Sequence, residues 1–304
     1  MTRRPILLLV NPVAGGKLAS GPELADDPAL LEPDALAAAL RAGDLAVDLR
    51  VLVEADDVRA LAAAGVAGGQ DVVVAGGDGT VSLAAEAVAG TDATLGILAL
   101  GSFNNIAHGF GVPRELDAAV AAIVRGAATA MDVGMARHAG GEEHAFFEAA
   151  GVGLDAAGFG AVELSERRGW WLGARALVRA LRQRRRGMRL VIDGVRYGTR
   201  APAVTVCNGP YLGMGFALAA EADPADGLLD IVIFSGMSRW EVLGHFARVA
   251  RGARRREPRI TRRRGREMTV QASSGVLPAH ADGRSIGLTP VIFTVRPGAL
   301  RVFH

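Results

Sequence analysis

The feature that most constrains the fold is a short stretch in which an apolar run ends in a cluster of glycines. Residues 71–75 read Asp-Val-Val-Val-Ala, and residues 76–80 read Gly-Gly-Asp-Gly-Thr. The β-branched run predicts a buried strand, and the small residues at 81–88 predict a helix. Where a buried strand leads through glycines to the start of a helix, backbone N–H groups can bind a phosphate and the helix dipole favours an anion. The stretch therefore predicts a phosphate site between a strand and a helix.

Strands and helices are expected to alternate through the first 130 residues. The expected strands are residues 6–10, 47–53, 71–75 and 94–100, and the expected helices are residues 34–40, 56–64 and 81–88. This alternation indicates βαβ units and a mostly parallel sheet with helices on both faces. Ligands of such sheets bind at the carboxyl ends of the strands, where this sequence has its glycine-containing turns.

From Met131-Asp132-Val133-Gly134 onward the pattern changes to short strands separated by turns. Asp193-Gly194 and Asp282-Gly283 are typical of hairpin turns and favour an antiparallel sandwich. One helix with a basic tail is expected at 173–186. We therefore expect two domains, 1–131 and 132–304, and the sequence leaves open whether the last strand returns to the first domain. The expected strands of the second domain are residues 144–149, 189–192, 203–207, 228–234, 267–272 and 291–295.

Length and composition agree with globular domains. The chain has 304 residues, of which 50% are hydrophobic and 22% charged, so it can bury a large core. Its single cysteine, Cys207, lies in an expected strand, where a buried structural thiol is favoured over a nucleophile. The apolar start is too short for a signal peptide, and no segment approaches the roughly 18 apolar residues that span a bilayer. These features predict a cytoplasmic protein, at most peripheral on the inner face of the membrane.

The positive charge is concentrated in the second part of the chain. Residues 1–131 contain 8 Lys and Arg against 16 Asp and Glu, and the remainder contains 26 against 16. Arg251–Arg266 contains nine arginines, and Arg182–Arg186 contains four. Such clusters attract anionic lipid head groups by roughly 1 kcal/mol for each basic residue, and Trp170-Trp171 is typical of an interfacial anchor. The alternatives are a solvated arginine-rich surface and tryptophans in the core.

The sequence also bears on nucleic-acid binding and on self-association. No recognition motif for nucleic acid accompanies the basic clusters, so we expect no nucleic-acid partner. The oligomeric state stays open, and a homo-oligomer is compatible with the sequence.

Three loops follow expected strands in a defined order: Asn11-Pro12, the glycine turn at 76–80, and Gly101-Ser102-Phe103-Asn104-Asn105. Together with residues 131–134, Asn208-Gly209 and the Asp-Pro-Ala-Asp-Gly-Leu-Leu-Asp segment at 223–230, they resemble the catalytic domain of the diacylglycerol kinase family, which includes bacterial lipid kinases and sphingosine kinases. The resemblance spans nearly the whole chain. It implies an N-terminal α/β nucleotide-binding domain, a C-terminal antiparallel β-sandwich-like domain, and ATP-dependent phosphorylation of a lipid alcohol such as diacylglycerol.

The resemblance also implies a site for ATP and Mg²⁺. Asp78 would bind the catalytic Mg²⁺ or its water network, with Asp132 as a second acidic group, and its glycine neighbours are expected to leave Asp78 exposed. Mg²⁺ prefers few protein carboxylates together with substrate phosphates. A separate Mg²⁺ would bind the Asp226 side chain and the carbonyls of Asp223 and Leu228. The residues expected to hold ATP are Asn11, Pro12, Gly15, Gly76, Gly77, Asp78, Gly79, Thr80, Gly101, Ser102 and Asn104.

Some of these residues also have ordinary structural interpretations. An Asp-Gly pair such as Asp226-Gly227 is typical of a hairpin turn, and Asp132 is typical of a cap or turn at the boundary of an element.

Arg284 departs from the family pattern. Members usually carry Asp-Gly-Glu near the end, with the Glu as the proposed base, whereas this chain has Asp282-Gly283-Arg284. Arginine stays protonated and cannot act as that base. Phosphoryl transfer depends mainly on positioning and electrostatics, so Asp78 or Asp132 could accept the proton instead, or Arg284 could orient an anionic acceptor. A working lipid kinase is favoured because the nucleotide loops are largely retained. The alternatives are a catalytically impaired nucleotide- or lipid-binding regulator and a NAD kinase-like enzyme.

Overall fold

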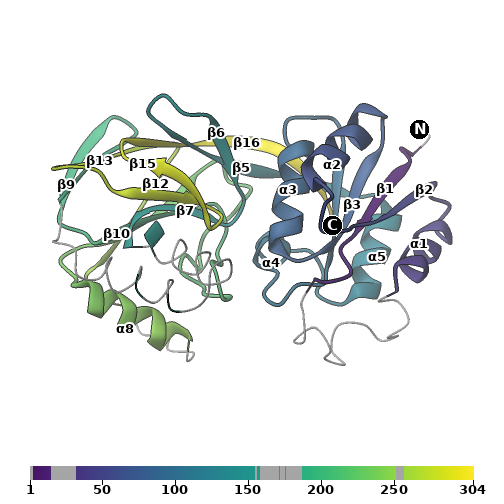
Figure 1. Ribbon diagram of the computed structural model, residues 1–304, viewed down its shortest axis with the longest axis horizontal. Coiled ribbons are helices and arrows are strands. Elements are labelled where there is room, and N and C mark those ends of the chain that lie inside the picture. The colour runs from purple at the N-terminus through teal and green to yellow at the C-terminus, as the bar shows by residue number, and fades with distance from the viewer. Residues whose placement is uncertain are drawn as a thin grey trace. The chain divides into compact units, whose positions relative to one another are not determined.

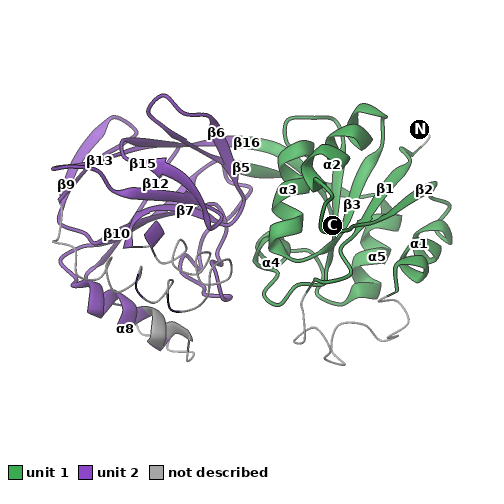
Figure 2. Cartoon of the chain, viewed as in Figure 1, with its two compact units in different colours: residues 1–132, 297–304 green, residues 133–296 purple. Residues whose placement is uncertain are grey.

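The computed structural model describes residues 3–14, 32–154, 156–157, 171, 175, 187–250 and 257–304 (Figure 1). The chain divides into two compact units (Figure 2). Unit 1 contains Met1–Asp132 and Pro297–His304, and unit 2 contains Val133–Arg296. The last residues of the sequence therefore belong to the same unit as the first. Gly15, Trp170 and most of the helix expected at 173–186 lie outside the described residues.

Unit 1 is built on a parallel sheet. Strands β1 (Ile6–Val10), β2 (Val47–Val51), β3 (Asp71–Gly76) and β4 (Thr94–Ala99) lie in the order β2-β1-β3-β4. The residues of β1 and β4 are all buried, as expected for strands covered on both faces. At the outer edge of β4, Arg301 and Val302 of β16 (Val291–Phe303) pair in parallel with Thr94 and Leu95. The predicted α/β sheet is confirmed.

Helices cover this sheet in pairs. Helix α2 (Val58–Ala67) packs beside α3 (Asp78–Val88), and α1 (Pro33–Arg41) packs beside α5 (Leu116–Arg125). In Figure 1 the two pairs lie on opposite sides of the sheet. The one-turn helix α4 (Asn105–Gly109) contacts α3 and β4. Neither α4 nor α5 was among the expected elements.

Helix α3 begins at Asp78, three residues earlier than the sequence predicts. Gly77 takes an extended conformation at the N-cap, and its carbonyl accepts the N–H groups of Thr80 and Val81. Asp78 therefore lies in the first turn of a helix instead of in the loop before it.

Unit 2 consists mainly of antiparallel strands in two sheets. One sheet has the order β12-β11-β10-β7-β14-β15, and the other contains β16-β13-β8-β9 in that order, with β5 paired to β6 and β16. One helix with a described position, α8 (Arg239–Ala250), follows β11. The strands are β5 (Ala128–His138), β6 (Glu143–Phe146), β7 (Ala149–Gly153), β8 (Met188–Ile192), β9 (Val195–Thr199), β10 (Ala203–Cys207), β11 (Leu229–Phe234), β12 (Ile260–Gly265), β13 (Glu267–Ala272), β14 (Pro278–Ala281) and β15 (Arg284–Leu288).

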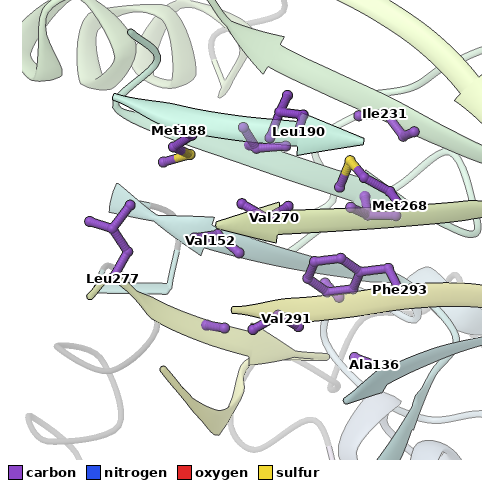
Figure 3. Close-up of a cluster of buried hydrophobic side chains, with 14 of the residues drawn as sticks. Ala136, Val152, Met188, Leu190, Ile231, Met268, Val270, Leu277, Val291 and Phe293 are labelled. Atoms are coloured by element: carbon purple, nitrogen blue, oxygen red, sulfur yellow. The ribbon is translucent and has the colours of Figure 1, made fainter. Parts of the chain in front are cut away.

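The core of unit 2 lies between these two sheets (Figure 3). Leu190 of β8 and Phe293 of β16 come from one sheet, and Val152 of β7 and Ile231 of β11 come from the other. Side chains from two facing sheets that share one core define a sandwich, so the predicted antiparallel sandwich is confirmed. Cys207 is buried in β10, as expected for a structural thiol.

Two expected strands of unit 2 differ from the structure. The run 144–149 is split into β6 and β7, because the backbone N–H groups of Phe147 and Glu148 bind the Asp282 carboxylate and leave the strand ladder. The run 291–295 continues as β16 to Phe303. The Asp-Gly turns are correct: Asp193-Gly194 and Asp282-Gly283 have left-handed conformations between paired strands, as two-residue hairpins require.

Candidate functional site: the strand ends of unit 1

The loop after β1 and the start of α3 are joined by Asn11 and Thr80. The Asn11 side chain donates from Nδ2 to Thr80 Oγ1 at 2.9 Å, and its Oδ1 accepts the Val13 N–H at 3.1 Å. The Asn11 backbone N–H donates to the Ala75 carbonyl at 2.9 Å. Pro12 is exposed beside this contact. The structure therefore brings together two of the loops predicted to hold ATP.

The loops after β3 and β4 meet backbone to backbone at Gly77 and Gly101. A Cβ atom on Gly101 would lie 2.5 Å from the Gly77 Cα, and one on Gly77 would lie 3.2 Å from the Gly101 Cα. A Cβ on Gly76 would lie 3.0 Å from the Thr80 Cβ. Packing within the protein therefore requires glycine at position 101 and leaves little room for a side chain at positions 76 and 77.

Gly79 is different from these three glycines. It is exposed in the first turn of α3, and a Cβ atom there would meet no other atom of the described residues within 4 Å. Its backbone conformation does not require glycine either, because its φ is not positive. The space above Gly79 lies at a helix N-terminus, where N–H groups and the helix dipole favour an anion.

The turn after β4 is closed by Asn104. Asn104 is buried in a left-handed conformation with φ 51°. Its Oδ1 accepts the Gly101 N–H and its Nδ2 donates to the Gly101 carbonyl, both at 2.8 Å. The Asn104 side chain thus shapes the turn, while Ser102 is exposed on it. Of these two predicted ATP contacts, Ser102 is the one that presents its side chain to solvent.

Asp78 binds the start of α4. Its Oδ1 accepts the Ile106 N–H at 3.0 Å, and the N–H groups of Asn104 and Asn105 also stabilise the carboxylate. Burial raises the pKa of Asp78, against the lowering effect of these N–H bonds. The expectation that Asp78 is exposed is wrong, since it is half-buried and its side chain links the strand-end loops.

Asp132 is buried in β5, with 2% of its surface exposed. Its Oδ1 accepts the Gly298 N–H at 2.8 Å, which fastens β5 to β16 within unit 1. The structure therefore gives Asp132 a positioning bond, and its role as a second acidic group stays a prediction.

The predicted ligands of the separate Mg²⁺ lie in one turn before β11. Asp223 Oδ1 accepts the Ala225 N–H and Asp226 Oδ1 accepts the Leu228 N–H, both at 3.0 Å. Asp226 Oδ2 is bound by Arg264, a contact that the sequence does not suggest. Burial also raises the pKa of the neighbouring Asp230. Within the described ranges, no group of three or more His, Cys, Asp or Glu side chains could hold a metal ion.

The Asp282-Gly283 turn, which precedes Arg284, is held in place by the Asp282 side chain. Its carboxylate accepts the N–H groups of Phe147 at 2.8 Å, Glu148 at 3.0 Å and Ala149 at 3.1 Å. Burial raises the pKa of Asp282 to about 6, although these bonds and the nearby Arg284 charge lower it. Arg284 itself is exposed at the start of β15.

Glu148, whose N–H group binds Asp282, also contacts the segment at residues 208–213. Its carbonyl accepts the N–H groups of Asn208 and Gly209, and its Oε2 lies 3.3 Å from the Gly213 nitrogen. The sequence indicates the Asp282-Gly283 hairpin and Asn208-Gly209 separately. Residues 147–149 join the two through hydrogen bonds between segments far apart in the sequence, which the sequence analysis did not predict.

Comparison with known proteins identifies the two parts of the chain. Residues 5–136 match the model of the diacylglycerol kinase catalytic domain, and residues 150–304 match that of the YegS C-terminal NAD kinase beta sandwich-like domain. A diacylglycerol kinase of Mycobacterium tuberculosis is 32% identical over 259 residues, which cover 83% of this chain and 82% of that protein. A Pseudomonas putida protein named "Probable lipid kinase YegS-like" is 31% identical over 274 residues, which cover 86% of this chain and 87% of that protein.

The fold agrees with these matches. The crystal structure of a diacylglycerol kinase from Bacillus anthracis is similar with a TM-score of 0.70 at 22% identity, and the alignment covers 100% of this chain and 98% of that one. The two domain models together match residues 5–136 and 150–304, and both relatives cover more than four fifths of the chain. The chain belongs to the diacylglycerol kinase catalytic-domain family.

Proposed function

We propose that this protein is a lipid kinase that transfers the γ-phosphoryl group of ATP to a lipid hydroxyl such as that of diacylglycerol. The observation that carries the proposal is the open space above Gly79, at the N-terminus of α3, beside the contact between Gly77 and Gly101. Packing leaves little room for a side chain at the other glycines of the contact, whereas the approach of a phosphate explains Gly79. Family membership supports ATP as the phosphate donor.

The residues around this space fit a nucleotide with its metal. Backbone N–H groups at the start of α3 would bind the phosphates, with the loops of Asn11 and Ser102 beside them. Asp78 would hold Mg²⁺ or its waters, and a single protein carboxylate suits an ion that keeps phosphate and water ligands. Mg²⁺ bound with ATP would supply neutralisation of the phosphate charge.

Asp78 is the group we propose as proton acceptor in place of the missing Glu. In this role it would bind Mg²⁺ through water, because a carboxylate bound directly to the ion is a weak base. Asp132 is fully buried and its Oδ1 is committed to the Gly298 N–H, so we assign it a positioning role. Arg284 carries a fixed positive charge on the surface and suits an anionic acceptor or lipid head group.

We propose further that the protein meets its substrate at an anionic membrane surface. Trp171 and Trp240 are each 67% exposed, which supports the interfacial interpretation of Trp171 over a place in the core. Arg262 and Arg263 of β12 are also exposed. No described helix is long and apolar enough to cross a membrane. Flotation with anionic and neutral vesicles tests the proposal, and binding that is equal for both, or absent from both, contradicts it.

One assay separates the candidate functions. Purified protein is incubated with γ-labelled ATP, Mg²⁺ and, in separate reactions, a panel of lipid alcohols or NAD. The proposal predicts label in a lipid. Label in NAD alone supports the NAD kinase-like alternative, and transfer by an Arg284→Glu variant but not by the natural chain supports the binding-regulator alternative.

A further inference from the structure

We infer that the guanidinium of Arg264 takes the place of a bound cation in the acidic turn at residues 223–228. Arg264 Nη2 binds Asp226 Oδ2, and Arg264 Nε lies 3.3 Å from Asp230 Oδ2. One permanently charged side chain therefore bridges the carboxylate predicted to bind the separate Mg²⁺ and the next carboxylate along the chain.

The backbone of two neighbouring strands sets this contact. Strands β11 and β12 are antiparallel, and Asp230 lies directly opposite Arg264. Residues directly opposite each other project to the same face with Cβ atoms roughly 5 Å apart. The pairing of β12 with β11 in this register therefore places Arg264 beside Asp230, at the end of the acidic turn.

The next residue, Gly265, holds β12 in this register. A Cβ atom on Gly265 would lie 2.6 Å from Ile192 Cγ2, so any larger residue would force β8 or β12 to shift. The following N–H groups, of Arg266 and Glu267, donate to the Asp193 carboxylate at 2.9 to 3.2 Å. A slip of β12 that would remove Arg264 from Asp230 would break these contacts as well.

Both carboxylate oxygens of Asp226 have partners within the protein. Asp226 Oδ1 accepts the Leu228 N–H, and Asp226 Oδ2 is bound by Arg264. The Asp223 carbonyl, a predicted Mg²⁺ ligand, accepts the Asp226 N–H at 3.4 Å. A cation in the turn would have to displace the Arg264 guanidinium or lie next to it. Two positive charges in adjacent positions repel each other. The residues of the turn therefore do not fit a metal ion while Arg264 is in place.

Thermal unfolding of the full-length protein without nucleotide tests this inference. The Tm of the natural chain should be the same in millimolar Mg²⁺ and in EDTA. Arg264→Met removes the guanidinium and should lower the Tm in EDTA. It should also create a response to Mg²⁺, seen as a rise in Tm of about 2–4 °C. The Asp226→Asn change in the Arg264→Met background should abolish this rise.

Arg263→Met is the matched control. Arg263 precedes Arg264 on β12, and its guanidinium lies over the Tyr197 ring, 5.9 Å from the ring centroid, instead of in the acidic turn. This variant loses the same charge from the same strand and should gain no response to Mg²⁺. A gain equal to that of Arg264→Met would show a general charge effect and overturn the inference.

Binding of Mn²⁺, followed by electron paramagnetic resonance without nucleotide, gives a second readout that does not depend on Tm. In the natural chain, the Asp226→Asn change should leave Mn²⁺ binding as it is. The Arg264→Met variant should bind one Mn²⁺ ion, and adding Asp226→Asn to this variant should abolish that binding. An Asp226-dependent ion in the natural chain, or a folded Arg264→Met protein with no such ion, would overturn the inference. If Arg264→Met does not fold, Arg264→Gln replaces it. No readout uses kinase activity, so the result is independent of the proposed function.

Discussion

Gly77 and Gly101 touch backbone to backbone at the ends of two neighbouring strands, and no side chain can be inserted between them. A Cβ atom on Gly101 would lie 2.5 Å from the Gly77 Cα and 2.7 Å from Asn104 Oδ1. This contact fixes the loop after β4 against the start of α3. It is the part of the candidate site that packing alone determines.

Gly101→Ala is expected to destabilise the protein. The added methyl group must push apart two backbone segments and the Asn104 amide, which costs about 1–3 kcal/mol. Urea unfolding of the variant and the natural chain measures the free energy of unfolding. Gly79→Ala is the control, because the same methyl group meets nothing there, and equal losses in the two variants would contradict the packing account.

Gly79→Ala is expected to weaken the use of ATP while the fold is retained. A methyl group at Gly79 would enter the space that we assign to a phosphate, and we expect the KM for ATP to rise about tenfold, a difference of about 1.4 kcal/mol. Steady-state kinetics with varied ATP measures this. Gly198→Ala, at an exposed strand position where a Cβ also meets nothing, is the control. An unchanged KM would argue against a phosphate at Gly79.

Asn11 and Thr80 are expected to be coupled in a double-mutant cycle. Their side chains are joined by a hydrogen bond of 2.9 Å between the loop after β1 and α3. Asn11→Ala and Thr80→Val should each destabilise the protein, and the double variant should lose less than the sum by about 1 kcal/mol. Thr80→Ser keeps the hydroxyl and should keep the coupling. Additive losses would show that the hydrogen bond contributes nothing.

The sequence predicts well the parts of the fold that depend on local pattern. The mainly apolar runs at β1 and β4 are buried on both faces, so their strand character is visible without knowledge of their neighbours. The Asp193-Gly194 hairpin is likewise local, because its left-handed conformations suit an Asp-Gly pair.

The parts that the sequence missed depend on distant partners. The break between β6 and β7 results from Asp282, more than 130 residues away from the N–H groups that it binds. Helix α4 is only one turn long, and its first N–H groups are stabilised by Asp78 from the first turn of α3. Strand β12 reads as a polar run of arginines, and only its pairing with β11 makes it a strand.

The stability of the protein is expected to fall as the pH rises through the range in which Asp282 loses its proton. Burial raises its pKa from 3.8 to about 6, so the folded protein binds more protons than the unfolded chain between these values. Stability therefore decreases with pH in that window. Asp282→Asn removes the titration, and unfolding in guanidinium chloride at pH 4.5 and 7 should show the natural chain losing stability relative to the variant.

Asp193→Asn is the control for this pH dependence, because Asp193 occupies the other Asp-Gly hairpin and also accepts backbone N–H groups. An increase in the stability of the natural chain relative to Asp282→Asn as the pH rises would contradict the account. It would show that the three N–H bonds to the carboxylate outweigh its burial.

The most direct test of the proposed function is the rate of phosphate transfer from γ-labelled ATP to diacylglycerol in anionic vesicles by the natural chain and by Asp78→Asn. The amide oxygen of Asn can still accept the Ile106 N–H, so the variant should fold, and its Tm is measured to verify this. Loss of the charge should reduce kcat by about 100-fold or more. Asp48→Asn, at an exposed position of the edge strand β2, should transfer phosphate at the natural rate. Equal rates for Asp78→Asn and the natural chain would contradict the central claim that Asp78 serves a phosphoryl-transfer site.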